Sequence, residues 1–118
     1  MLIADTSVWV AHLRAGDVGL EALLDNALVV CHPFIIGEVA CGNLVNRGEI
    51  LSLMRALPAA DVADDDEVMR FIETHLLMGK GLGYVDVSLL ASAKLTGVPL
   101  WTLDKRLGEA SSALGLSY

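Results

Sequence analysis

The amino-acid sequence predicts an α/β fold built around a parallel sheet, and three observations support this. Short apolar runs at residues 2–4, 27–31 and 100–103 have the length and composition of buried strands. Longer segments between them carry apolar residues at helical spacing. The first and last runs are each followed by an aspartate, Asp5 and Asp104, and parallel strands place such residues at one edge of their sheet, where ligands bind. We therefore expect strands alternating with helices, and a site at that edge.

Length and composition predict one domain over residues 1–118. A chain of 118 residues buries roughly two-thirds of its unfolded surface without needing disulfides. Apolar residues make up 54% of the chain and the mean hydropathy is +0.57. Both values are high for a small soluble protein, so we expect a partner or a second copy to cover some apolar surface.

Charge, apolar runs and cysteines exclude several classes of protein. The net charge of −7 argues against a broad basic surface for nucleic acid, although a cation bound by carboxylates would invert the local charge. No apolar run is long enough to span a membrane, so we expect a cytoplasmic protein. Cys31 and Cys41 have no CxxC or Cys/His spacing and are interpreted as reduced core residues, without a disulfide or zinc site.

The first half of the chain predicts two strands and three helices. Residues 6–14 carry apolar side chains at helical spacing until Gly16 breaks the pattern, and residues 19–26 predict a short second helix. The run ALVVC at 27–31 predicts the second strand. A helix is expected to follow it over residues 33–46, with proline at a first helical position.

The second half predicts further helices separated by short apolar runs. Residues 48–57 are amphipathic, and residues 60–63 have the composition of a short strand. The acidic run at 64–67 fits the first turn of the next helix, where negative charge favours the helix dipole. The glycine-rich stretch 78–83 lacks the spacing of a phosphate loop and is interpreted as a flexible loop. Helices at 84–96 and 105–114 enclose the strand at 100–103, and residues 116–118 fit an edge strand.

Four carboxylates are candidate site residues: Asp5, Glu38, Asp86 and Asp104. Asp5 and Asp86 also fit a structural role as helix caps. Glu38 has apolar or small residues at its helical neighbour positions and no Lys or Arg among them. These neighbours predict that Glu38 does not face solvent and that a metal ion pairs with its carboxylate. The alternative is that Glu38 reaches the surface at a helix edge.

The ordered set of these residues resembles the PIN-domain ribonucleases, and among them the VapC-type toxins of toxin–antitoxin pairs. The resemblance covers essentially the whole chain. Its most specific parts are the opening Asp5-Thr6-Ser7 after an apolar run, and the interval from Asp86 to Thr102-Leu103-Asp104, in which a helix ending in glycine leads into a short strand. It implies a three-layer α/β/α fold with a short, mostly parallel sheet of four to five strands flanked by helices.

The resemblance also implies an activity, a cofactor and partners. Carried over by position, it makes the four carboxylates a pocket that holds Mg²⁺ or Mn²⁺, with Thr6, Ser7 and Thr102 as nearby hydroxyls. The activity implied is an endoribonuclease acting on an RNA such as tRNA or rRNA. Family members usually form homodimers and are silenced by an antitoxin protein whose C-terminal segment covers the groove.

The chemistry of the residues agrees with a metal site. Four gathered carboxylates repel one another without a cation, whereas a hard divalent ion prefers oxygen ligands. We hypothesise that Asp5, Asp86 and Asp104 hold the ion directly or through water, and that Glu38 orients the attacking water. Lys80, Lys105 and Arg106 are candidates for steering the RNA backbone.

Two other interpretations remain open from the sequence. In a phosphatase of the haloacid dehalogenase type, Asp5 would be a covalent nucleophile, but such enzymes carry a second aspartate where this chain has Ser7. A catalytically silent PIN-like module would instead act through RNA or partner contacts. RNA cleavage by the purified protein separates these possibilities.

Overall fold

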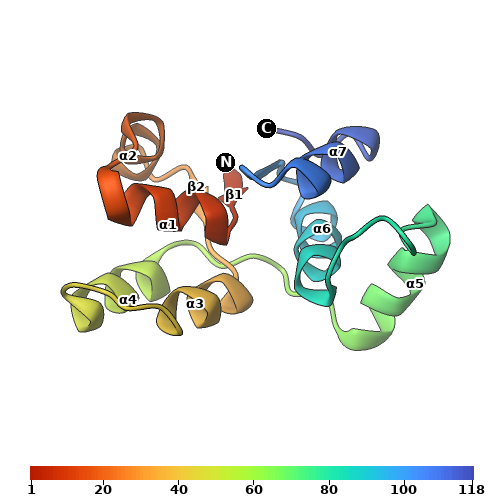
Figure 1. The fold of residues 1–118 in the computed structure, drawn as a ribbon, viewed down its shortest axis with the longest axis horizontal. Coiled ribbons are helices and arrows are strands. Elements are labelled where there is room, and N and C mark those ends of the chain that lie inside the picture. Colours follow the sequence, from red (N-terminus) through yellow and green to blue (C-terminus); the bar gives the residue numbers. More distant parts are fainter.

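The computed structural model describes all residues, 1–118, as a short parallel sheet enclosed by seven helices (Figure 1). The three strands have the spatial order β2-β1-β3. The strands are β1 (Leu2–Ala4), β2 (Val29–Val30) and β3 (Leu100–Trp101), and the helices are α1 (Thr6–Ala15), α2 (Val18–Asp25), α3 (Pro33–Ala40), α4 (Arg47–Ala56), α5 (Asp65–His75), α6 (Tyr84–Thr96) and α7 (Lys105–Ala113).

The helices form a layer on each side of the sheet. Helices α1 to α4 lie on one side of the strands and α5 to α7 on the other (Figure 1). Helix α1 contacts β1 and α3, whereas α6 contacts β3 and α5. The three-layer α/β/α arrangement expected from the sequence is therefore confirmed.

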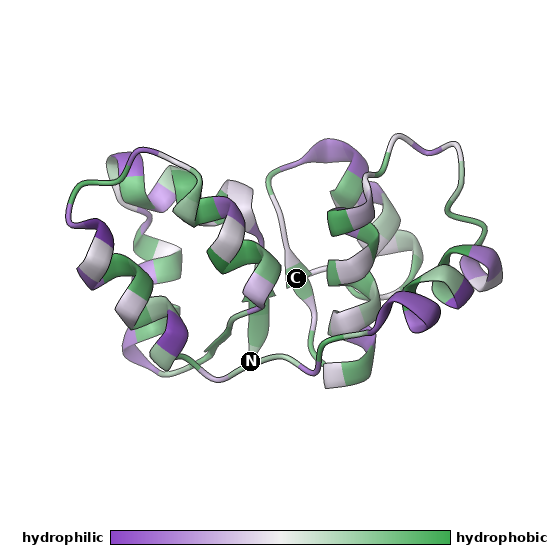
Figure 2. Cartoon of the chain, turned by 90° about the horizontal axis from the view of Figure 1, so that it is seen from below, coloured by the Kyte–Doolittle hydropathy of each residue, from purple (hydrophilic) through white to green (hydrophobic).

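The core follows the central strand and the helix that packs on it. Every residue of β1 is buried, and α6 buries seven consecutive residues, Val87 to Ala93. Helix α6 is therefore not clearly amphipathic, because few of its positions face water. Hydrophobic residues predominate in the strands and in the helix faces turned towards them (Figure 2). No helix has the length and apolar character that crossing a membrane requires.

Strand register places two chain segments side by side at the site. Ile3 of β1 pairs with Val30 on one side and with Leu100 on the other, both in parallel. The ladder continues one step further, because the Asp5 amide donates to the Trp101 carbonyl at 2.9 Å. Asp5 and the residues that follow Trp101 therefore leave the sheet at the same edge.

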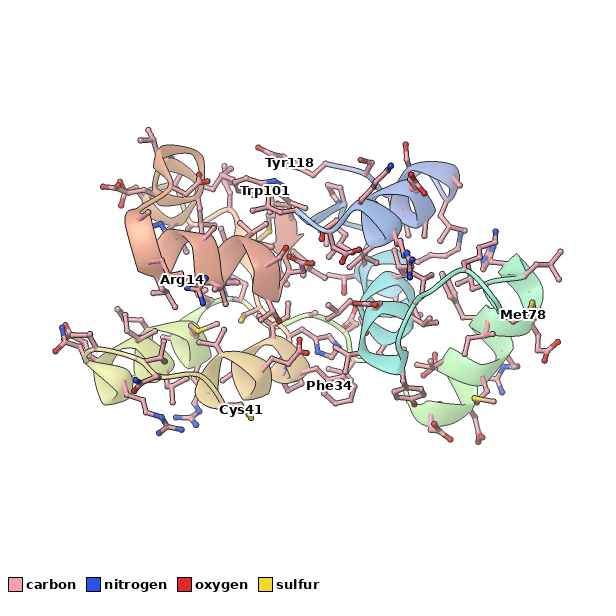
Figure 3. The ribbon with its side chains drawn as sticks, in the orientation of Figure 1. Arg14, Phe34, Cys41, Met78, Trp101 and Tyr118 are labelled. Atoms are coloured by element: carbon pink, nitrogen blue, oxygen red, sulfur yellow. The ribbon has the colours of Figure 1, made fainter.

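The sheet has three strands rather than the expected four to five. The segments at 60–63 and 116–118 each lie near the sheet, but only single parallel bridges form, between Cys31 and Ala59 and between Leu100 and Ser117. The first segment leaves the sheet because Ala63 donates its amide to the Ser92 hydroxyl instead of a strand. At the second segment the Trp101 and Tyr118 rings lie 5.6 Å apart beside the bridge (Figure 3).

Helix α3 ends six residues earlier than expected. The prediction extended it to residue 46, but it ends at Ala40, whose carbonyl accepts a hydrogen bond from the Arg47 guanidinium at 2.9 Å. That bond satisfies a carbonyl at the helix end, and Gly42 and Asn43 beyond it favour turn conformations. Cys41 consequently lies exposed at the helix end (Figure 3), so its assignment to the core was wrong, whereas Cys31 is buried.

Candidate active site

Asp5 is the most deeply buried carboxylate of the candidate site, with 5% of its surface exposed. Its Oδ1 accepts hydrogen bonds from the Ser7 hydroxyl and from the Val8 amide, and its Oδ2 accepts one from the Thr102 hydroxyl. The Val8 bond caps α1, so the structural role considered from the sequence is correct. The two hydroxyl bonds go beyond capping, because they hold both oxygens of a buried anion in place.

The Thr102 hydroxyl joins Asp5 to Asp104. Its oxygen accepts a hydrogen bond from the Asp104 amide at 3.0 Å, while its proton goes to Asp5. The Ser7 oxygen similarly accepts from the Leu103 amide at 3.0 Å. Asp104 in turn caps α7, because its Oδ1 accepts from the Leu107 amide at 2.9 Å. The start of α1 and the turn before α7 are therefore tied together by side chains.

Glu38 is linked to the same segment through its neighbour in space, Thr6. The Thr6 hydroxyl donates to Glu38 Oε1 at 2.6 Å. Glu38 is exposed, so the prediction that it is held away from solvent was wrong. Helix α3 ends two residues after it and Gly37 presents no side chain, which leaves the carboxylate open to water. Glu38 also lines a hollow of about 600 Å³ between α1, α3 and the turn that precedes α4.

Asp86 is the half-buried third residue of α6. Its Oδ2 accepts a hydrogen bond from the Gly83 amide at 3.0 Å, which caps the start of that helix. No side-chain hydrogen bond connects Asp86 with Asp5, Glu38 or Asp104. As the side chains stand, no three Asp, Glu, His or Cys residues form a group able to hold one metal ion. The meeting of all four carboxylates at one ion remains a prediction.

The starts of three helices supply positive potential to this site. Asp5 and Asp104 are the N-caps of α1 and α7, and Asp86 lies in the first turn of α6. Unpaired amides at a helix N-terminus carry a partial positive charge that favours anions. The three aspartates are thus accommodated without a Lys or Arg hydrogen-bonded to any of them. Several side-chain oxygens, drawn red in Figure 3, lie in the region between α1, α3, α6 and α7.

His32, two residues after β2, joins the segment that follows this strand to α6. Its ring is fully buried, with Nδ1 accepting from the Phe34 amide and Nε2 in a 3.1 Å hydrogen bond with the Ser92 hydroxyl. Burial lowers the pKa of His32, which keeps the ring neutral. The sequence offered no signal for this contact, because Ser92 lies 60 residues away. The contact anchors the end of β2 to α6, on which Asp86 lies.

Comparison with known proteins assigns the chain to a family. Residues 2–112 match the PIN domain model. The chain therefore belongs to the PIN-domain family. It is 43% identical over 118 residues to "Ribonuclease VapC32" from two strains of Mycobacterium tuberculosis, which covers 99% of this chain and 95% of the relative. The resemblance to VapC-type proteins stated from the sequence is confirmed.

A solved structure supports the same fold. The crystal structure of PAE2754 from Pyrobaculum aerophilum matches with a TM-score of 0.68, over 92% of this chain and 83% of that one. At 18% identity this likeness concerns the fold alone.

Proposed function

We propose that the chain is an endoribonuclease that depends on Mg²⁺ or Mn²⁺, and that it is the toxin of a toxin–antitoxin pair. The proposal is supported by the ribonuclease to which the chain is 43% identical over nearly its full length. The observation that carries it is the buried Asp5 carboxylate, held by the Ser7 and Thr102 hydroxyls at the carboxyl edge of the sheet. The hydrogen bonds from Ser7, Val8 and Thr102 offset the cost of burying this anion and fix both of its oxygens, which favours a preorganised ligand site.

The donor set fits a hard divalent cation. The four carboxylates and three hydroxyls are all oxygen donors, with no thiolate or imidazole among them. Magnesium keeps several of its waters and takes few protein carboxylates, so it does not need three of them in direct contact. In this proposal Asp5, Asp86 and Asp104 hold the ion directly or through water. When bound, the ion lowers the pKa of water and offsets negative charge on a phosphate.

Glu38, Ser7 and Thr102 have the remaining roles in the proposed reaction. Glu38 is exposed and its Oε1 is fixed by Thr6, so it is able to accept a hydrogen bond from an attacking water in a defined direction. Ser7 and Thr102 prevent rotation of the Asp5 carboxylate. The products expected are two RNA fragments from hydrolysis of one phosphodiester bond.

The two other interpretations receive less support. In the haloacid dehalogenase interpretation, Ser7 takes the position of a second acid, but its hydroxyl donates to Asp5 and thereby lowers its nucleophilicity. The family match also lies with PIN domains. A silent RNA-binding module keeps the same geometry and is distinguished by the experiment below.

The test compares wild type with Asp5→Asn and with the control Asp61→Asn. Asp61 is exposed and its carboxylate makes no hydrogen bond, so the control changes the charge equally away from the site. With Mg²⁺ or Mn²⁺, we expect Asp5→Asn to lose at least about 100-fold in RNA cleavage and to lose Mn²⁺ binding by calorimetry. Asp61→Asn is expected to match wild type. Equal cleavage by Asp5→Asn, or wild-type protein that leaves tRNA and rRNA fragments intact, contradicts the proposal.

We also propose a homodimer and a cognate antitoxin as partners, and a cytoplasmic location. The likeness to a VapC ribonuclease supports both partners, and apolar side chains exposed on several elements are available for contact with them, among them Val18, Val45, Leu53, Leu76 and Leu103. Light scattering of the purified protein tests the dimer. A small reading frame beside the gene, whose product binds the protein and stops cleavage, tests the antitoxin.

A further inference from the structure

The Arg106 side chain lies against the backbone of Gly81, in space that a side chain at position 81 would fill. A Cβ placed on Gly81 would stand 2.8 Å from Arg106 Cδ and 3.0 Å from its Cζ. Gly81 also has a φ of +73°, which glycine adopts without strain. Only glycine therefore allows the guanidinium to take this position.

The contact lies between two of the acid-bearing elements. Arg106 is the second residue of α7, two positions after Asp104. Gly81 stands two positions before Gly83, whose amide binds the Asp86 carboxylate. The segment leading into α6 passes beside the start of α7 (Figure 1), so Arg106 bridges the segments that bear Asp86 and Asp104.

Arg106 carries its positive charge at the N-terminal end of α7, where the helix dipole is also positive. A cation in the first turn of a helix is disfavoured by the helix dipole. The guanidinium makes no hydrogen bond within the protein, whereas that of Arg47 donates to the Ala40 carbonyl. Arg106 is exposed, and its five donors are available to an external anion.

Because the chain is acidic overall, each cation beside the site matters for the affinity for a phosphate. The chain has eight Lys and Arg against fifteen Asp and Glu, so few groups are available to bind phosphates. Most of the affinity for nucleic acid comes from cations that neutralise phosphates. A guanidinium binds a phosphate with two parallel hydrogen bonds, which also sets its direction.

We infer that Arg106 binds an internucleotide phosphate of RNA next to the candidate active site, and that Gly81 keeps the space for its guanidinium. This inference rests on the proposed function, because the RNA it names is the substrate proposed above. Among the three cations considered from the sequence, Arg106 is chosen because its side chain lies against Gly81, between the segments that bear Asp86 and Asp104.

The test uses two variants and two matched controls. Arg106→Gln removes the charge, and Gly81→Ala displaces the guanidinium without removing it. Arg55→Gln removes an exposed cation in the last turn of α4. Gly79→Ala controls for backbone strain, because Gly79 has a φ of +72° and nothing within 4 Å of its Cβ position.

Two readouts separate a phosphate contact from a structural role. For RNA cleavage with Mn²⁺, Arg106→Gln is expected to raise KM by about tenfold and to leave kcat within about threefold. For binding of a single-stranded RNA oligonucleotide, measured by fluorescence anisotropy in the non-cleaving Asp5→Asn background, the slope of log affinity against log salt is expected to fall by about 0.7. Gly81→Ala is expected to act like Arg106→Gln and to add nothing to it in the double variant, and both controls are expected to keep wild-type KM and slope.

Unchanged RNA affinity and salt slope in Arg106→Gln overturn the inference, and a lower melting temperature alone then assigns Arg106 to bracing the 79–83 segment. Equal effects of Gly79→Ala and Gly81→Ala overturn the role of Gly81. If wild type binds RNA without cutting it, the proposed function fails while the binding assay still tests Arg106. Wild type that binds no RNA overturns both.

Discussion

Thr102→Val is expected to destabilise the protein through a single lost hydroxyl. Valine has nearly the same shape as threonine, so packing is retained while two strong hydrogen bonds and a weak 3.5 Å contact with the Ser7 hydroxyl disappear. One is the bond that Thr102 donates to Asp5, and the other is the bond it accepts from the Asp104 amide at 3.0 Å. Losing the two bonds costs different amounts of stability, because water reaches the Asp104 amide but not the buried Asp5 carboxylate.

The bond to Asp5 determines the size of the effect. A hydrogen bond to a charged group contributes about 1.5–3 kcal/mol, and water does not replace it at a carboxylate that is 5% exposed. Asp104 is exposed, so water satisfies its amide at little cost. We expect a loss of about 2 kcal/mol in the free energy of unfolding, which lowers the melting temperature of a chain of this size by about 8 °C.

Urea denaturation and thermal melting without divalent metal measure this loss. Thr74→Val is the matched control, because Thr74 is exposed on α5 and its hydroxyl makes no hydrogen bond. In an Asp5→Asn background the cost of Thr102→Val is expected to fall to about 1 kcal/mol, since bonds to neutral acceptors are about half as strong. A cost no larger than that of Thr74→Val refutes the claim that Thr102 holds the Asp5 carboxylate.

Two further predictions follow from the pKa shifts in the core. Burial lowers the pKa of His32 below 6.5, so between about pH 7 and 5 the unfolded chain takes up a proton that the native state excludes. The free energy of unfolding should therefore fall with decreasing pH by up to about 1.4 kcal/mol per unit, and His32→Asn should flatten this dependence in urea denaturation. The same slope in both proteins would exclude His32 as its source. Burial also raises the pKa of the Cys31 thiol to about 11, so a thiol reagent at pH 8 should modify one cysteine quickly, the exposed Cys41, and two only in denaturant. Fast modification of both native thiols would show that Cys31 is accessible.

The sequence by itself determined the elements and the candidate residues. Apolar runs and helical spacing are local properties, so β1, β3 and most helices lie close to the predicted ranges. Capping is local as well, because Asp5 and Asp86 accept hydrogen bonds from amides within three residues. The family resemblance rested on the same short motifs, and the match over residues 2–112 confirms it.

Only the tertiary structure decided how these residues meet. The bond from Thr102 to Asp5 joins residues 97 positions apart, and it depends on the register of β1 with β3, which no local pattern contains. The exposure of Glu38 was likewise decided by the fold, because α3 ends at Ala40 and the elements around it leave the carboxylate open to water. Sequence patterns report which surface an element buries, whereas the partners of a polar side chain are set by how the elements pack in three dimensions.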